Sequence, residues 1–241
     1  MKTNVLSLTI AVILLIVSGC GNKSTDNASG NISEKGQVDE SWISLFNGED
    51  LSGWRSFHSD TIVGWTVEDG CLTALGEGGD LGGDIISTEK FDNFILELEW
   101  KIAPEGNSGI MFRVLEEGFK TTYATGPEYQ LIDDEGFPQP LEDWQTTGAN
   151  YAMHKASGEI IIKPVGEFNS TRIVVDSSHV EHWLNGIKVV EYELWSEEWQ
   201  ELKDNGKWKD FADYGMAKSG YISLQDHGSK TWFKNIRLKK L

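Results

Sequence analysis

The chain has 241 residues, a formal net charge of −17 at pH 7, and ten tryptophans and ten phenylalanines. Its acidity argues against nucleic-acid binding, which needs a basic surface, and disfavours direct binding to anionic lipid. The chain has two cysteines, Cys20 and Cys71, which are too few for a disulfide framework or a cysteine-based zinc site.

Residues 1–19 are typical of a signal peptide. Lys2 precedes an apolar run that ends near Val17, and this run is too short to cross a bilayer, which needs about 20 apolar residues. The sequence Val17-Ser18-Gly19-Cys20 resembles a bacterial lipobox, which implies that Cys20 is lipidated. The alternative is an ordinary signal peptide with an incidental cysteine. We expect a cell-envelope lipoprotein that meets the membrane only through this anchor.

Residues 20–41 contain mainly Gly, Asn, Ser, Asp, Lys and Glu. Such a segment cannot bury enough apolar surface to offset its conformational entropy, so we predict a flexible tether. Residues 42–241 are then expected to form one domain, which is long enough to bury a sizeable core. Within it, Cys71 lies in a strand-like stretch and is expected to be a small buried apolar residue.

Period-two alternation of apolar and polar residues predicts antiparallel strands with one buried face. The clearest case is residues 94–102, where every second residue is large and apolar. For residues 110–114 the same spacing predicts one face with Ile110, Phe112 and Val114, and an opposite face with Met111 and Arg113.

The rest of the chain predicts an all-β sandwich with a short helical excursion. Asn185-Gly186 is a strong hairpin signal, Ser196 is a plausible N-cap for a helix within 196–211, and residues 133–158 form a long loop without a clear period. The remaining predicted strands are 128–132, 159–163, 171–176, 180–184, 187–192, 221–225 and 231–238.

Seven motifs follow in order along nearly all of residues 42–241. They are LFNGEDLSGW from Leu45, WTVEDG from Trp65, NSGIMFR from Asn107, EYQLID from Glu128, TGANY from Thr147, GYISLQDHG from Gly220 and FKNIR from Phe233. Together they resemble the 3-keto-disaccharide hydrolase domain family. The resemblance implies a concanavalin A-like jelly roll of two curved antiparallel sheets. It also implies action on glycosides already oxidised to a ketone at sugar carbon three.

Two positions depart from the family pattern. Lys234 stands where this family commonly has Arg, and Asn150 stands where an apolar residue is usual. Lys234 keeps the positive charge, so the departures put only local contacts in doubt.

Polar side chains with strand spacing suggest where chemistry could occur. Glu128 and Gln130 are two residues apart and share one face of a strand, while Gln225 and His227 lie at the end of another. From this pattern and the resemblance, Glu128 and His227 are the candidate base and acid, in either order. The candidate substrate-binding residues are Arg113, Gln130, Gln225, Asp133, Tyr151 and His154.

These residues also have structural interpretations. Glu128 could be a solvent-facing carboxylate, Arg113 could form an outer-face ion pair, and Asp226-His227-Gly228 could be only a tight turn. Asp133 could merely shape a loop, and His182 could be a packing residue.

The acidic run Asp133, Asp134 and Glu135 could bind a divalent metal such as Ca²⁺, although its spacing is not that of an EF-hand. The metal requirement therefore stays open. The sequence has no His-Glu-x-x-His zinc motif and no Gly-x-Ser-x-Gly nucleophile elbow. The close carboxylate pair of retaining glycosidases is not evident either.

A ketone at carbon three would acidify the hydrogen at carbon two. A base could remove this hydrogen, the aglycone would leave from carbon one by elimination, and water would then add. In this hypothesis Arg113 and Gln130 hold the oxyanion or the sugar hydroxyls. The alternatives are a lectin-like carbohydrate-binding module without chemistry, and a structural or partner-binding surface lipoprotein.

Overall fold

The computed structural model describes residues 41–77 and 83–241. The predicted signal peptide, the lipidation site Cys20 and all but the last residue of the predicted tether lie outside this part, so those assignments stay predictions. Within the described residues, no helix is both long enough and apolar enough to cross a bilayer.

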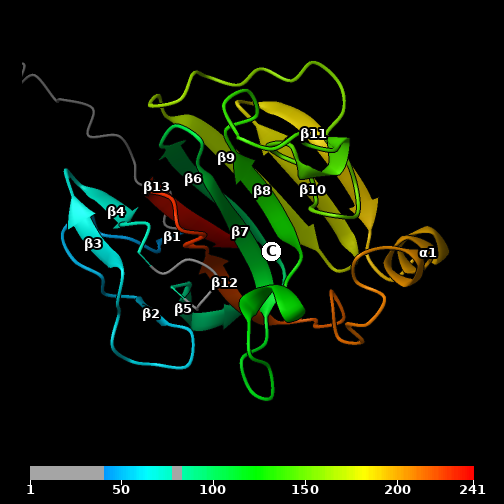
Figure 1. The fold of residues 1–241 in the computed structure, drawn as a ribbon. Helices are drawn as coiled ribbons and strands as arrows, with labels where there is room; N and C mark the ends of the chain where they lie inside the picture. The colour runs from blue at the N-terminus through cyan, green and yellow to red at the C-terminus, as the bar shows by residue number, and fades with distance from the viewer. Residues whose placement is uncertain (1–40, 78–82) are drawn as a thin grey trace, which may run out of the picture. The chain divides into compact units, whose positions relative to one another are not determined.

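Two antiparallel sheets pack face to face, which confirms the predicted all-β sandwich (Figure 1). The larger sheet has the order β11 (Ile187–Glu193), β10 (His179–Leu184), β9 (Asn169–Asp176), β6 (Phe94–Ile102), β13 (Thr231–Lys240), β4 (Cys71–Ala74) and β3 (Trp65–Glu68), with β1 (Trp42–Ser44) also paired to β13. The smaller sheet has the order β2 (Trp54–Ser56), β5 (Ile85–Phe91), β12 (Gly220–Leu224), β7 (Asn107–Val114) and β8 (Glu128–Ile132).

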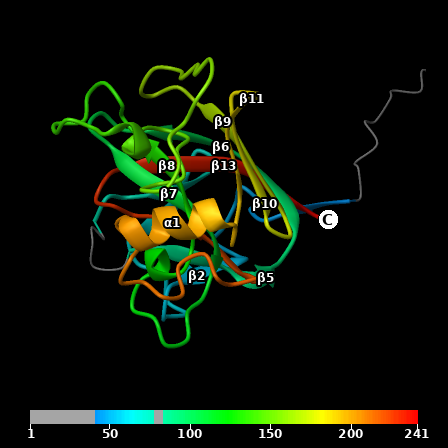
Figure 2. The ribbon, with the colours of Figure 1, turned by 90° about the vertical axis from the view of Figure 1, so that its right-hand side faces the viewer.

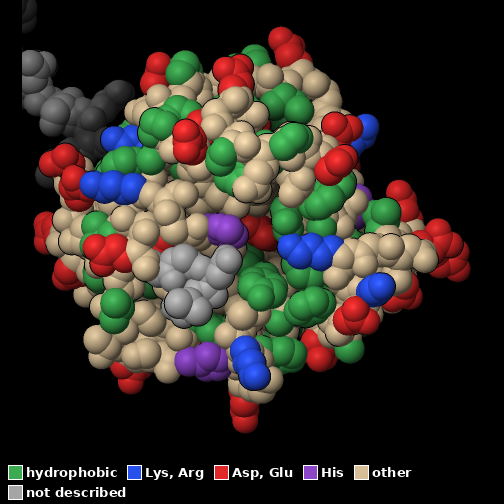
Figure 3. All heavy atoms as spheres, viewed as in Figure 1, with side chains coloured by type: hydrophobic (Ala, Val, Ile, Leu, Met, Phe, Trp, Pro, Cys, Tyr) green, Lys and Arg blue, Asp and Glu red, His purple; other side chains and the backbone are tan. Residues whose placement is uncertain are grey.

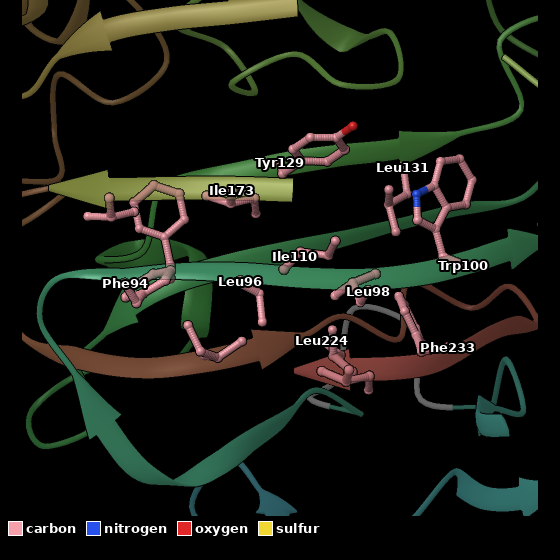
Figure 4. Close-up of a cluster of buried hydrophobic side chains, with 14 of the residues drawn as sticks. Phe94, Leu96, Leu98, Trp100, Ile110, Tyr129, Leu131, Ile173, Leu224 and Phe233 are labelled. Carbon is pink, nitrogen blue, oxygen red and sulfur yellow. The ribbon is translucent and has the colours of Figure 1, made fainter. Parts of the chain in front are cut away.

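The core fills the space between the two sheets (Figure 4). The alternation predicted for residues 94–102 is confirmed, because every second side chain of β6 is buried there. From the smaller sheet, Ile110, Tyr129, Leu131 and Leu224 point into the same layer. Since a strand alternates its side chains, the residues between them lie on the outer face of the smaller sheet.

A register shift in β7 changes the faces of its last residues. Between β7 and β12 the pairing slips, so that Ile222 alone faces both Phe112 and Arg113. Arg113 takes a left-handed conformation with φ of 52°, as in a β-bulge. Val114 consequently packs with Met111 on the outer face and not with Phe112 in the core, so the predicted face of Val114 was wrong.

The helical excursion is present but shorter than the range predicted. Helix α1 spans Glu197–Asn205, and the Ser196 hydroxyl accepts a hydrogen bond from the Trp199 N–H at 3.1 Å, which confirms the N-cap. Trp199 is buried, whereas Leu202 is exposed. The helix lies on the right-hand side of the sandwich in Figure 1, the side that faces the viewer in Figure 2.

One predicted strand was wrong. Residues 159–163 form an exposed, irregular segment, although three consecutive isoleucines favoured a strand. The main-chain N–H of Lys163 is bonded to the side chain of Asn169 at 2.8 Å and not to a strand. By contrast, the Asn185-Gly186 hairpin between β10 and β11 is confirmed, with φ of 49° and 84° at its two turn residues.

The long loop at 133–158 is present and contains a short 3₁₀ helix, η3 (Asp143–Gln145). A second 3₁₀ helix, η2 (Thr122–Ala124), lies in the connection between β7 and β8. Cys71 is buried, as expected.

Candidate functional site

Glu128 and Gln130 share the outer face of β8, as their spacing predicts. Each faces a partner on β7, with Met111 opposite Glu128 and Gly109 opposite Gln130. A Cβ atom built on Gly109 would lie 2.2 Å from Glu128 Oε1, so the carboxylate lies across this glycine. Glu128 is only 4% exposed, which argues against the interpretation of a solvent-facing carboxylate.

Burial raises the pKa of Glu128 to about 8. The desolvated site disfavours the carboxylate form, the positive charge of Lys207 opposes this effect, and the negative charge of Asp84 adds to it. A carboxylate of raised pKa is a stronger base than an ordinary one, and such groups concentrate at active sites.

Asp84 is a second, partly buried carboxylate near Glu128, and it comes directly before β5. It accepts hydrogen bonds from the Thr122 hydroxyl and, at 3.1 Å, from the main-chain N–H of Asp226. Burial is the main cause that raises its pKa to about 6, with a further rise from Asp226 and a decrease from His227. Asp84 was not predicted from the sequence, where its only local signal is a Gly-Gly pair directly before a strand.

Lys207 and Tyr151 approach the site from outside the sheet. Lys207 Nζ donates to the Tyr151 hydroxyl at 3.1 Å and lies 4.2 Å from the centre of the Tyr151 ring. The main-chain N–H of Tyr151 donates to the Glu128 carbonyl at 3.0 Å, so this residue is fixed beside the start of β8. Tyr151 was predicted to be near the site, whereas Lys207, in the segment after α1, was missed.

The end of β12 brings Gln225 and His227 to the same face. The Gln225 N–H donates to the Gly109 carbonyl at 3.0 Å, and its side-chain Oε1 is buried without a hydrogen-bond partner among the described residues. His227 is exposed and its charge acts on Asp84. Gln130 Nε2 donates to Asn107 Oδ1 at 3.2 Å. Five predicted site residues are thus on this face: Glu128, Gln130, Tyr151, Gln225 and His227.

Figure 3 shows this face of the molecule from the side of β7, β8 and β12. Near its centre the surface is hollowed, and acidic atoms are recessed between hydrophobic side chains, with a Lys or Arg side chain and a histidine at the edge. This mixture of apolar walls and a few polar groups is typical of a small-molecule site.

Arg113 is not part of this site, which corrects its assignment. The bulge turns its side chain to the inner side, where it is buried between the sheets. Its guanidinium donates to the Asp92 and Ser177 carbonyls at 2.9 Å and to Asn93 Oδ1 at 3.2 Å. These contacts join the β5–β6 turn to the β9–β10 turn, so Arg113 has a structural role.

Asp133 also has a structural role. Its carboxylate accepts hydrogen bonds from the main-chain N–H groups of Glu105 and Gly136, both at 2.9 Å. Asp134 likewise accepts from the Thr147 N–H at 2.9 Å. These bonds shape the loop after β8, which was the structural alternative for the acidic run.

His154 packs inside the long loop. Its ring stacks on Tyr192 with centroids 4.5 Å apart, and its Nδ1 lies 3.1 Å from the Asn150 side-chain nitrogen. Burial lowers the pKa of His154 to about 4, so its imidazole is neutral at pH 7. His182 is fully buried against Tyr129, as expected for a packing residue.

Among the described residues, three side chains on β10 and β11 are close enough to share a metal ion: His179, Glu181 and Glu191. Both carboxylates already pair with Lys188 Nζ, at 3.0 and 2.7 Å. This group lies on the larger sheet, whereas Glu128 lies on the smaller one.

Replacing Gly109 with alanine is expected to lower kcat/KM about 10–100-fold, because the new Cβ would displace the Glu128 carboxylate. The fold should tolerate this change, since the atoms that have to move belong to the Glu128 side chain and not to the backbone. Steady-state kinetics and thermal melting would measure the two effects. Unchanged kinetics would show that the carboxylate position over Gly109 does not matter for activity.

Comparison with known proteins agrees with this picture. A model of the 3-keto-alpha-glucoside-1,2-lyase-like domain matches residues 41–239. A Bacteroides thetaiotaomicron protein named 3-keto-disaccharide hydrolase is 34% identical over 230 residues, which cover 84% of this chain and 79% of that protein.

Two solved structures are also similar to this chain. A Parabacteroides distasonis protein proposed to be a glycosyl hydrolase is 40% identical, with a TM-score of 0.79 over 85% of this chain and 98% of that one. A second protein from the same organism, with the same proposed activity, is 26% identical, with a TM-score of 0.64 over 83% and 99% of the two chains.

Proposed function

This chain belongs to the 3-keto-alpha-glucoside-1,2-lyase-like domain family, and on that premise we propose that it cleaves 3-keto-glycosides. At the coarser level it is a hydrolase that acts on glycosides. The observation that carries the finer proposal is the buried Glu128 carboxyl, with a pKa of about 8, on the hollowed face of the smaller sheet. Such a group is suited to removing a carbon-bound proton.

Glu128 is the base in this proposal. Its ionised carboxylate takes the proton from carbon two, and the electrons of that bond pass toward the ketone oxygen as an enolate. The enolate then collapses, the bond between carbon one and the aglycone oxygen breaks, and a double bond remains between carbons one and two. Addition of water across this double bond gives the free 3-keto sugar, so that the net change is hydrolysis.

Polar groups around Glu128 have supporting roles. The buried Oε1 of Gln225 is an unused acceptor for a sugar hydroxyl, while the Gln130 amide lies two residues from the base on the same strand face. His227, exposed beside Asp84, is placed to assist the addition of water. These amides take over the role of holding the oxyanion or the sugar hydroxyls. Arg113 cannot fill that role, because its guanidinium is inside the sandwich.

The direct test is to incubate the purified protein with 4-nitrophenyl 3-keto-glucosides of α and β linkage, with and without a chelator. We expect release of 4-nitrophenol from at least one keto substrate and none from the unoxidised glucosides. Sensitivity to the chelator would reveal a metal requirement. Binding of plain glycans without any release would favour the lectin-like alternative.

The pH dependence of kcat/KM should follow the ionisation of Glu128. Because the ionised form of Glu128 is required, kcat/KM is expected to increase with pH through the region around pH 8 and to level off above it. A pH profile of kcat/KM with a 4-nitrophenyl substrate measures this limb. A profile that is flat from pH 6 to pH 9 would contradict the role of Glu128.

A further inference from the structure

Elimination from carbon one needs a second proton transfer that Glu128 does not provide. The aglycone leaves as an anion unless its oxygen receives a proton, and this need is greatest for weakly acidic aglycones. Because carbons one and two are bonded to each other, the donor has to lie close to the base. His227 acts on Asp84, whereas the segment at Tyr151 is bonded directly to Glu128, so that segment is the first place to look for the donor.

Tyr151 has the required position. Its main chain is bonded to the Glu128 carbonyl at 3.0 Å, and its ring is partly exposed on the same side of the molecule. The charge of Lys207, which lies 3.1 Å from the Tyr151 hydroxyl, also reaches the Glu128 carboxyl. One lysine therefore links the base and this phenol.

The hydrogen bond from Lys207 leaves the phenol proton available. An ammonium group can only donate, so the Tyr151 oxygen is the acceptor, and its own O–H is directed elsewhere. The adjacent positive charge also stabilises the negative charge that develops on the phenol oxygen as its proton leaves.

The surrounding aromatic residues hold this pair in place. The Trp208 indole donates to the Tyr151 carbonyl at 3.2 Å. The Trp144 and Tyr151 rings pack edge to face with their centroids 5.5 Å apart. Trp208 is only 1% exposed and stacks on Tyr214 with centroids 4.1 Å apart. A donor supported in this way is pre-positioned, which general acid catalysis requires.

We propose that Tyr151 is the general acid that protonates the departing aglycone oxygen, and that Lys207 positions its hydroxyl and stabilises the phenolate. This inference rests on the proposed function. As the bond at carbon one breaks, its electron pair goes to the aglycone oxygen, which takes the phenolic proton. In the hydration step the phenolate takes a proton from water, hydroxide adds to carbon one, and Glu128 returns its proton to carbon two. Both residues are then restored.

The test uses a series of aryl 3-keto-glucosides whose leaving phenols range from 2,4-dinitrophenol to the much less acidic 4-methoxyphenol. For Tyr151→Phe we expect kcat/KM to stay near the wild-type value with 2,4-dinitrophenyl and to fall about 100-fold or more with 4-methoxyphenyl. Lys207→Met should also make kcat/KM depend more steeply on the acidity of the leaving phenol. Lys207→Arg should bring this dependence part of the way back toward that of the wild type. These lysine variants also test the proposal if Tyr151→Phe does not fold.

Tyr123→Phe is the matched control. Tyr123 is an exposed phenol whose ring is 6.4 Å from the Trp208 ring, but the Lys207 hydrogen bond goes to Tyr151. Removal of the Tyr123 hydroxyl should leave the leaving-group dependence as in the wild type. If Tyr151→Phe lowers the rates of all substrates by the same factor, its role is binding or structure and the inference fails. If the wild-type protein releases no phenol from any of them, the proposed function itself fails.

Discussion

Replacing Glu128 with glutamine is expected to lower kcat/KM on a 3-keto-glycoside about 1,000-fold and to stabilise the folded protein at alkaline pH. Glutamine keeps the shape of the side chain but cannot accept the proton from carbon two. The loss should be similar for good and poor leaving groups, because the base acts before the aglycone departs. Full activity of this variant would eliminate Glu128 as the base.

The stability effect follows from the raised pKa. The folded state keeps the Glu128 proton up to about pH 8, whereas an ordinary unfolded glutamate loses it near pH 4.5. Between these values the folded state binds more protons, so the wild-type protein loses stability as the pH rises. Glutamine removes this loss. We expect Glu128→Gln to be about 5 kcal/mol more stable than wild type at pH 9 and nearly equal at pH 4.

Chemical denaturation at a series of pH values measures this difference, and Glu116→Gln is a control of opposite sign. The hydrogen bonds from Arg55, at 2.6 Å, are the main cause that lowers the pKa of Glu116 to about 2. Glu116 therefore stabilises the fold above pH 4.5, and this contribution is lost as the pH falls toward 2. Its replacement should destabilise the protein at neutral pH and leave kcat/KM unchanged.

Replacing Arg113 with methionine is expected to destabilise the protein by about 3 kcal/mol, with little change in kcat/KM. Methionine fills much of the same volume, but the Asp92 and Ser177 carbonyls lose a charged donor in partly buried hydrogen bonds. For a domain of this size the melting temperature should decrease by about 10 °C.

The kinetics of this variant separate the two interpretations of Arg113. If its guanidinium contacted the sugar, as the sequence suggested, Arg113→Met would raise KM while the melting temperature stayed nearly constant. The structure leads to the opposite expectation, which thermal melting and steady-state kinetics below the melting transition can check. Arg113→Lys is an informative second variant, because one ammonium cannot reach both turns as the planar guanidinium does.

Much of the fold could be predicted because alternation is a local property. The strand at residues 94–102 and the Asn185-Gly186 hairpin were recognised from neighbouring residues alone. The segment 159–163 shows the limit of this approach, since a run of isoleucines is compatible with a strand only where another strand is free to pair with it. The face of Val114 was wrong for a related reason, because a bulge depends on the register of the partner strand.

The candidate site could be predicted only where its residues lie on regular strands. Glu128 and Gln130 were found from their spacing of two. Asp84 and Lys207 come from segments without regular periodicity, and only the folded chain brings them toward Glu128. Asp133 and His154 were included because they are polar residues of a long loop, where a sequence cannot distinguish a ligand contact from a bond to the main chain.

The hydrogen bond between Asp84 and the Asp226 N–H joins positions 142 residues apart, and its consequence concerns the order of folding. A chain that is still being synthesised cannot close this contact before Asp226 has been made, so Asp84 reaches its native environment late in folding. Enzyme activity would then appear late in folding. Contacts between residues this far apart in the sequence are typical of slowly folding β proteins.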